Sequence, residues 1–188
     1  QMDGRVLPVI SNIIVTRKLN DDEIDAHNFK TFSPIANTKN LLYYYRKLPD
    51  NRILFGTRGD LKGSDQSNLA MSKKMEKFLK DIFPHWSNVK IDYNWRGLIA
   101  LSQKLTPSIG KIENEEIYYG FGYNGVGVSA APWTGKQLSK IVFSSNSKNL
   151  NISNIYKGLP KKFIFPQFRI FYFRLAVWFY TLKDKFNF

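Results

Sequence analysis

The chain has 188 residues, 43% hydrophobic and 15% aromatic, a composition that predicts a folded globular protein and excludes a disordered one. It contains no cysteine, which excludes a disulfide framework, a thiolate metal site and a cysteine nucleophile. The formal net charge of +13 raises the question of a nucleic-acid partner, but the basic residues are scattered without any run of five like charges, so we expect none. The first residues lack a charged-then-apolar secretory leader, and we expect a cytoplasmic location.

The N-terminal part of the chain predicts strands joined by polar turns. Residues 10–16 are rich in β-branched side chains and predict a strand, whereas residues 18–40 predict a loop with a short helical turn. Residues 41–46 and 52–56 are strand-like and flank a Pro-Asp-Asn turn, so together they predict a hairpin. A loop rich in glycine and charge is expected over 56–63.

A helix and a further strand complete this part. Apolar residues at helical spacing predict a helix over 69–83, which Pro84 ends. Apolar and polar residues alternate over 89–95, the pattern of a strand with one face on a core, and we expect Trp95 to belong to that core. These elements predict an α+β domain built on an antiparallel sheet.

The C-terminal part begins with a short apolar strand over 117–119, followed by a glycine-rich sequence, residues 120–127, which we call the glycine segment. Apolar residues at helical spacing predict a helix over 133–143, with Pro132 in its first turn. Residues 144–154 are polar and resemble a linker, and the rest of the chain is basic and aromatic.

The glycine segment formally matches the G-x-G-x-x-G dinucleotide fingerprint through Gly120, Gly122 and Gly125. That fingerprint requires a ribose-binding acid about twenty residues further on, yet residues 117–183 contain no acidic residue. Closely spaced glycines before a helix still suit a ligand, because backbone amides can approach an anion or an electron-rich carbonyl without a Cβ in the way. The alternative is a tight strand-to-helix turn that needs positive φ.

The two histidines predict no metal site. His27 falls in a polar loop and His85 at a helix end. Isolated histidines without a set of further ligands more often pack or lie at the surface. We therefore expect no metal.

Four ordered motifs carry a family resemblance. They are Tyr44-Tyr45-Arg46 with Pro49-Asp50-Asn51-Arg52-Ile53-Leu54-Phe55-Gly56, Trp95-Arg96-Gly97-Leu98, Pro107-Ser108-Ile109-Gly110, and Gly122-Tyr123-Asn124-Gly125-Val126-Gly127-Val128. In this order and at this spacing, the chain resembles the D-amino-acid oxidase and glycine oxidase superfamily of FAD-dependent oxidoreductases, above all the γ-glutamylputrescine oxidoreductase branch. The resemblance spans nearly the whole chain.

The resemblance implies an FAD domain built from both ends of a longer chain and a substrate domain between them. Residues 1–105 would be the C-terminal portion of the substrate domain, and residues 106–145 the C-terminal strand and helix of a split Rossmann-like FAD-binding domain. Residues 146–188 would be a linker and a basic aromatic C-terminal helix. The N-terminal FAD-binding half would be missing, so we expect a fragment that is inactive alone. The implied reaction oxidises the C–N bond of an amine to an imine by hydride transfer to FAD.

The resemblance also implies roles for individual residues. The backbone near the N1–C2=O edge of the flavin would come from Gly122, Tyr123, Asn124, Gly125, Val126, Gly127 and Val128, and it would stabilise negative charge there. Tyr44 would contact the substrate, and Arg46, on the same strand face, could hold a carboxylate. The alternatives are hairpin packing and a solvated cation. No catalytic base is assigned.

The sequence departs from its amino-acid-oxidising relatives at two arginines. The arginine that clamps a substrate carboxylate corresponds to Ile99, and a second arginine of glycine oxidases corresponds to Gly125. An apolar side chain does not replace a bidentate clamp. We therefore expect a small-molecule amine or N-substituted amine, similar to γ-glutamylputrescine, instead of a simple α-amino acid.

The aromatic tail leaves alternatives open. Residues 163–182 are nearly all apolar, but Arg169 and Arg174 would cost about 2.5–3.5 kcal/mol each in a membrane, so we expect no spanning helix. A helix docked on the FAD domain is the first interpretation, and peripheral membrane contact is the second. The alternative to an enzyme is a basic module that binds membrane or nucleic acid through this tail.

Overall fold

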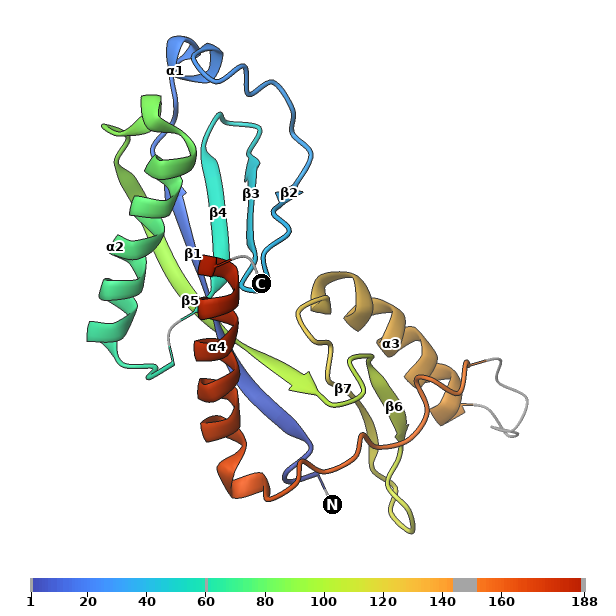
Figure 1. Ribbon diagram of the computed structural model, residues 1–188. Coiled ribbons are helices and arrows are strands. Elements are labelled where there is room, and N and C mark those ends of the chain that lie inside the picture. Colours follow the sequence, from blue (N-terminus) through green and yellow to red (C-terminus); the bar gives the residue numbers. More distant parts are fainter. Residues whose placement is uncertain (1, 60, 144–151, 187–188) are drawn as a thin grey trace. The chain divides into compact units, whose positions relative to one another are not determined.

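The computed structural model describes residues 2–59, 61–143 and 152–186, and the chain divides into two compact units (Figure 1). The first, which we call the hairpin unit, comprises Gln1–Val9 and Ile99–Phe173. The second, which we call the sheet unit, comprises Ile10–Leu98 and Arg174–Phe188.

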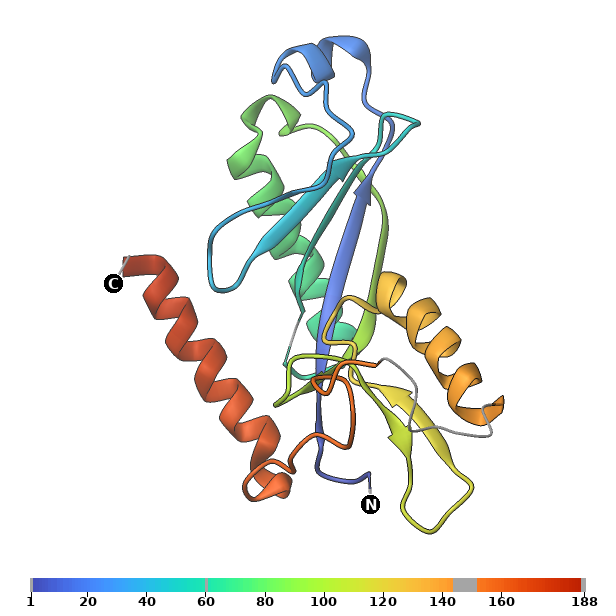
Figure 2. The same cartoon turned by 90° about the vertical axis from the view of Figure 1, so that its right-hand side faces the viewer.

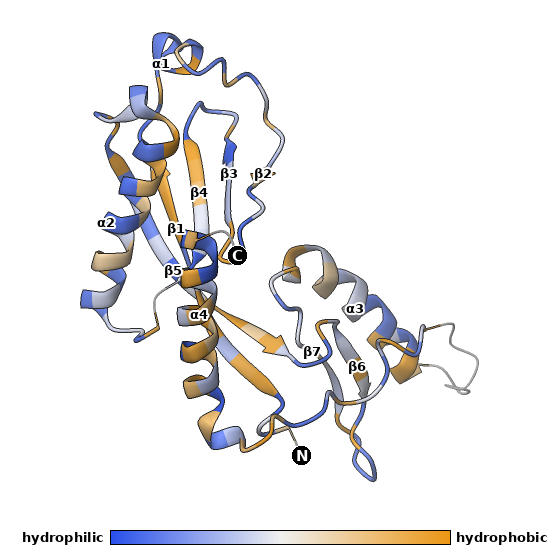
Figure 3. Ribbon diagram, in the orientation of Figure 1, coloured by the Kyte–Doolittle hydropathy of each residue, from blue (hydrophilic) through white to orange (hydrophobic). Residues whose placement is uncertain are grey.

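A five-stranded sheet with the strand order β2-β3-β4-β1-β5 organises the sheet unit. Its strands are β1 (Val6–Thr16), β2 (Ile35–Ala36), β3 (Tyr43–Lys47), β4 (Ile53–Arg58) and β5 (Ile91–Ser102). Strand β4 pairs antiparallel with both β3 and β1, so the predicted hairpin is confirmed. Strand β4 extends to Arg58, two residues beyond the predicted end at Gly56. Figure 3 shows β1 and β4 as largely hydrophobic strands.

Helix α2 (Asp65–Ile82) runs along one face of this sheet (Figure 2). The Ser64 side chain accepts a hydrogen bond from the Ser67 amide at 3.2 Å and caps the helix, which begins at Asp65, four residues before the predicted start. Pro84 opens a 3₁₀ turn (Pro84–Trp86), so α2 ends as predicted. The short helical turn predicted within residues 18–40 is α1 (Asp21–Asp25).

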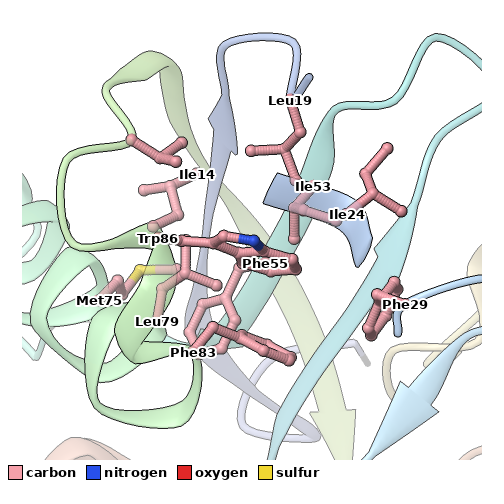
Figure 4. Packing of buried hydrophobic residues seen from close by; sticks show 11 residues of the cluster. Ile14, Leu19, Ile24, Phe29, Ile53, Phe55, Met75, Leu79, Phe83 and Trp86 are labelled. Atoms are coloured by element: carbon pink, nitrogen blue, oxygen red, sulfur yellow. The ribbon is translucent and has the colours of Figure 1, made fainter. Parts of the chain in front are cut away.

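The core of the sheet unit lies between α2, the sheet and α1 (Figure 4). Its buried members are Ile14, Leu19, Ile24, Phe29, Ile53, Phe55, Met75, Leu79, Phe83, Trp86 and Val89. Trp86 is fully buried, and its indole N–H donates to the Glu23 carbonyl at 2.7 Å, which satisfies the only polar atom of that side chain. The alternating pattern of β-strand residues and the helical stripe of α2 therefore meet in one core.

Strand β5 corrects one prediction, because Trp95 does not belong to the core and is 45% exposed. Two polar side chains of β5, Asn94 and Arg96, contact the start of α2. Arg96 donates to the Ser64 carbonyl at 2.6 Å and pairs with Asp65 at 3.0 Å, and both acceptors lie at the start of α2. The sequence therefore predicts the strand correctly, but of the alternating apolar residues Ile91 packs on the core whereas Tyr93 and Trp95 are exposed.

The hairpin unit is built from β6 (Ser108–Lys111), β7 (Tyr118–Phe121) and α3 (Gly127–Phe143). Strands β6 and β7 pair antiparallel, and a bridge from Ile109 to Lys157 extends this small sheet. A Cβ at Gly120 would lie 2.3 Å from Thr134 Cγ2, so glycine permits the close packing of α3 on β7.

Helix α4 (Arg169–Phe186) follows a 3₁₀ turn (Pro166–Phe168) and confirms the predicted C-terminal helix. From Arg174 onward it belongs to the sheet unit, and its expected docking on the FAD domain stays a prediction. The Asp184 carboxylate accepts from the Leu41 amide at 2.8 Å and from the Asn40 amide at 2.9 Å. Within the described residues, no helix is both long and apolar enough to cross a membrane. Most of the predicted linker lies outside the described residues.

Candidate functional site

The glycine segment connects β7 to α3, and three of its residues adopt left-handed backbone conformations. The φ angles are 74° at Gly122, 53° at Asn124 and 97° at Gly125. Glycine and asparagine are the residues that enter this region at least cost. The order Gly-Tyr-Asn-Gly is therefore what this sharp connection requires.

Helix α3 begins at Gly127, six residues before the predicted start at Trp133. Pro132 is consequently the sixth residue of the helix and not part of its first turn. Proline has no N–H, so the Val128 carbonyl lacks its usual helical donor. The correction matters for the site, because the helix N-terminus now falls inside the glycine segment.

Several backbone donors of the glycine segment are available to a ligand. Within the described residues, the amides of Gly125, Gly127 and Val128 make no hydrogen bond. Gly125 is exposed, and Val128 is 96% exposed although it is apolar. The first amides of a helix carry partial positive charge and have no partner inside the helix. Such donors suit an anion or a carbonyl edge that gains negative charge.

Asn124 fixes the conformation of the glycine segment. Its side-chain oxygen accepts from the Ser102 amide at 2.8 Å, and its own amide donates to the Ala100 carbonyl at 3.3 Å. Its side-chain nitrogen donates to the Gly122 carbonyl. These bonds tie the segment to the end of β5, so its amides are held in place before any ligand binds.

Ser102 is a site residue that the sequence did not single out. It is 2% exposed, and its hydroxyl has no hydrogen-bond partner within the described part of the chain. A Cβ at Gly122 would lie 3.5 Å from that hydroxyl, whereas a Cβ at Gly125 would meet only Ile99 Cδ1, at 4.0 Å. A lone serine at a strand end carries no sequence signal, so only the fold reveals it. The space beside Gly125, together with the unpartnered amides of Gly125, Gly127 and Val128, is compatible with the edge of a flavin ring.

The predicted substrate residues Tyr44 and Arg46 lie together on β3 of the sheet unit. The Tyr44 ring crosses Gly56 of the paired strand, and its hydroxyl is 3.4 Å from Ser11 Oγ. Arg46 is exposed and makes no hydrogen bond or ion pair with the described residues. Tyr43, next to Tyr44, points the other way and packs on Phe78 of α2, with ring centroids 4.9 Å apart. Tyr44 and Arg46 therefore share the sheet face that α2 leaves uncovered.

The two histidines are neighbours in the sheet unit. Their ring centroids are 5.0 Å apart, and His27 Nε2 accepts from the His85 amide at 3.3 Å. Burial, together with the neighbouring His85, lowers the pKa of His27 below its ordinary value. No group of three or more histidine, aspartate and glutamate side chains that could hold a metal occurs among the described residues. The rings of Phe83 and Trp86 surround His27, which gives it a packing role.

Known sequences resemble nearly the whole chain. A probable oxidoreductase, OrdL, of Haemophilus influenzae is 30% identical over 99% of this chain and 41% of that protein. The γ-glutamylputrescine oxidoreductase of Escherichia coli K12 is 28% identical over 98% of this chain and 42% of that protein. The chain thus spans about two fifths of the length of these curated relatives.

Solved structures share the fold. Iminodiacetate oxidase from Chelativorans sp. BNC1 has a TM-score of 0.61 at 17% identity, covering 85% of this chain and 42% of that one. Glycine oxidase from Geobacillus kaustophilus has a TM-score of 0.60 at 15% identity, covering 87% of this chain and 41% of that one. At these identities the likeness shows the fold alone, and it confirms the expected α+β architecture.

The family model described as FAD dependent oxidoreductase, abbreviated DAO, matches residues 1–141. This match covers the sheet, the glycine segment and most of α3. It agrees with the resemblance carried by the four sequence motifs. The chain therefore belongs to the DAO family of FAD-dependent oxidoreductases, whose cofactor is FAD.

Proposed function

We propose that this chain is the part of an amine oxidoreductase that supplies one edge of the flavin site and one wall of the substrate site. The remaining FAD-binding half would come from residues that precede this chain. Residues 1–105 would contribute to the substrate domain and residues 106–145 to the FAD-binding domain. The observation that carries the proposal is the set of unpartnered amides of Gly125, Gly127 and Val128 at the start of α3.

FAD, when bound, would accept a hydride from the carbon that bears the amine nitrogen. The chain's own contribution would be electrostatic. The amides of Gly125, Gly127 and Val128 would donate to the pyrimidine edge of the ring, where α3 adds partial positive charge. Because Asn124 already holds the segment, these donors need no reorganisation when negative charge develops.

The proposed substrate is an amine or N-substituted amine, similar to the γ-glutamylputrescine named for the Escherichia coli relative. Tyr44 would contact it, and Arg46 would bind a carboxylate remote from the reacting carbon. One observation and the family resemblance support this choice. Arg46 is an exposed cation without an ion pair among the described residues. By the resemblance, Ile99 corresponds to the clamp arginine of amino-acid oxidases, so a carboxylate next to the reacting carbon would have no partner there.

The test of the flavin edge uses Gly127→Val in the full-length protein, with Gly135→Val as the matched control. Both glycines lie in α3, and an added Cβ meets nothing closer than 3.7 Å at Gly127 and nothing within 4 Å at Gly135. We expect Gly127→Val to lose bound flavin, measured by its visible absorbance per protein, while circular dichroism stays unchanged. Gly135→Val should keep its flavin. If Gly127→Val keeps normal flavin content and turnover, the glycine segment only connects β7 to α3 and does not contact the flavin.

The substrate assignment is tested by Arg46→Met, with Lys77→Met on exposed α2 as the control. For an amine that carries a remote carboxylate, we expect KM to rise about tenfold or more, since charge-assisted hydrogen bonds are among the stronger ones. For a similar amine without the carboxylate, KM should not change. Equal effects on both substrates would contradict the proposed role of Arg46.

A further inference from the structure

A cavity of about 470 Å³ lies within the sheet unit, apart from the surface of Tyr44 and Arg46. It is bounded by α2, by the residues at the start of β3 and the end of β4, and by the second half of α4. Its apolar lining is supplied by Leu41, Leu61, Met71, Phe78 and Val177. Cavities of about 300–1,000 Å³ are the usual size of small-molecule sites.

The polar lining of this cavity is strongly cationic. Four cationic side chains border it, those of Lys39, Arg58, Lys74 and Lys185, against one described acid, Asp184. Three of the four, Lys39, Lys74 and Lys185, are exposed, so the excess of charge acts as a positive potential that attracts an anion to the cavity. The composition therefore favours a negatively charged occupant.

Asp184 does not neutralise these cations fully, because it is already engaged by the backbone. Its carboxylate accepts from the Leu41 amide at 2.8 Å and from the amide and side-chain nitrogens of Asn40 at 2.9 and 2.8 Å. Burial alone would raise the pKa of Asp184, but these hydrogen bonds and the nearby charge of Lys39 outweigh it and hold the pKa below its usual value. The carboxylate thus serves to fasten α4 over the cavity.

Two lysines of the lining, Lys39 and Lys74, lie over aromatic rings. Lys39 lies 6.0 Å from the Tyr43 ring centroid, and Lys74 lies 5.4 Å from that of Phe78. Neither lysine forms an ion pair with a described residue. Burial lowers the pKa of the Arg58 guanidinium, so its charge is partly desolvated at the cavity wall. An anion placed here would gain charge-assisted hydrogen bonds without first breaking a salt bridge of these lysines.

The cavity is distinct from the proposed substrate surface. Tyr43 lines the cavity, and the adjacent Tyr44 points to the opposite face of the sheet. Every residue of the lining belongs to the sheet unit, whereas the glycine segment belongs to the hairpin unit. A ligand here would therefore act from behind β3, on the opposite face of the sheet from the residues assigned to the substrate.

We propose that this cavity binds an organic carboxylate with an apolar chain. The cationic side chains would bind the carboxylate, and the apolar lining from Met71, Phe78 and Val177 would surround the chain. An inorganic anion would leave that apolar lining unused, and an apolar molecule would leave the lysines without a bound anion. The amphiphilic carboxylate satisfies both parts of the lining.

The test is isothermal titration of the full chain with octanoate, octanol and octylamine, three probes of equal chain length. We expect octanoate to bind, octanol to bind at least about tenfold more weakly, and octylamine to show no binding. Added salt should weaken octanoate binding. Absence of octanoate binding, or equal binding of the alcohol, would overturn the proposal.

Three variants locate the bound probe. Lys74→Met should weaken octanoate binding about tenfold, whereas Lys73→Met, a change at the next residue of α2 and outside the lining, should leave it unchanged. Both lysines are exposed, so both variants should fold, which circular dichroism checks. Arg46→Met should have no effect. If Arg46→Met abolishes binding while Lys74→Met does not, the carboxylate occupies the proposed substrate surface and this inference is wrong.

Discussion

Replacing Gly56 with alanine tests how β4 positions the Tyr44 ring. The residue sits in the middle of β4, directly opposite Tyr44 of β3, and its φ lies outside the left-handed region. Alanine therefore suits the backbone. The new Cβ, however, would lie 2.2 Å from Tyr44 Cζ and 2.5 Å from its hydroxyl oxygen. Since nonbonded carbons prefer about 3.5–4.0 Å, the ring must move by more than an ångström.

The expected cost follows from two opposing terms. Overpacking of this kind costs about 1–3 kcal/mol, which here includes the lost contact between the Tyr44 hydroxyl and Ser11 Oγ at 3.4 Å. Alanine in a strand recovers about 0.5–1 kcal/mol relative to glycine, because the unfolded chain has less freedom. We therefore expect Gly56→Ala to lower the free energy of unfolding by about 1–2 kcal/mol.

A double-mutant cycle separates the clash from any backbone effect. In a Tyr44→Ala background the obstacle is gone, so Gly56→Ala should be neutral or stabilising. Urea denaturation of the four proteins should give an interaction energy of about 2 kcal/mol with an unchanged m-value. In the full-length enzyme, Gly56→Ala should also raise KM, because the displaced ring is the proposed substrate contact. If the effects of Gly56→Ala and Tyr44→Ala on the free energy of unfolding are additive, the prediction is wrong, because the position of the Tyr44 ring then does not depend on the absence of a Cβ at residue 56.

Three further changes have equally definite outcomes. Phe55→Ala leaves a cavity at a fully buried position, so urea denaturation should show the free energy of unfolding lowered by about 3–5 kcal/mol. A decrease below about 1 kcal/mol would show that the core repacks around the cavity. Asn124→Gly keeps the left-handed backbone but removes both side-chain hydrogen bonds of Asn124. The full-length protein should then bind flavin more weakly, with little loss of stability. Unchanged flavin affinity would show that these two hydrogen bonds are not needed. Folding lowers the pKa of His27, so the unfolded state takes up a proton at a higher pH than the folded state does. The contribution of His27 to stability is therefore complete above the ordinary histidine pKa of about 6.5, and it decreases as the pH is lowered below that value. His27→Gln should reduce the decrease of the melting temperature between neutral and acid pH. An unchanged dependence of the melting temperature on pH would contradict this role of His27.

Local patterns in the sequence predict much of the sheet unit. The turn chemistry around Asp50 and the β-branched strands predict the hairpin, and the apolar stripe predicts α2. The start of α3 was missed because Val128, Ser129 and Ala130 show no helical periodicity, and Pro132 seemed to mark the first turn. The backbone accepts proline at the sixth position here, at the loss of one hydrogen bond.

Tertiary contacts explain the remaining differences. Trp95 follows the period of a buried face but is 45% exposed, and no local pattern reports the contact of Arg96 with the start of α2. The contact of Asp184 with Asn40 joins residues 144 apart, and no local pattern reports it. The roles proposed for Gly122, Asn124 and Gly125 come from the family resemblance and the conformational needs of glycine, whereas the hydrogen bond between the Ser102 amide and Asn124 is visible only in the fold.

The fastening of α4 by Asp184 has a consequence for biosynthesis. A ribosome makes the amino end first, so Asn40, Met71 and Phe78 emerge long before Asp184, which lies 144 residues beyond Asn40. During that interval the nascent sheet unit has an uncovered apolar flank and two unpartnered amides. Transiently exposed apolar surface of this kind is what chaperones bind and what promotes aggregation. A stalled or shortened chain ending before α4 should therefore be retained by chaperones even though its sheet and α2 have already formed.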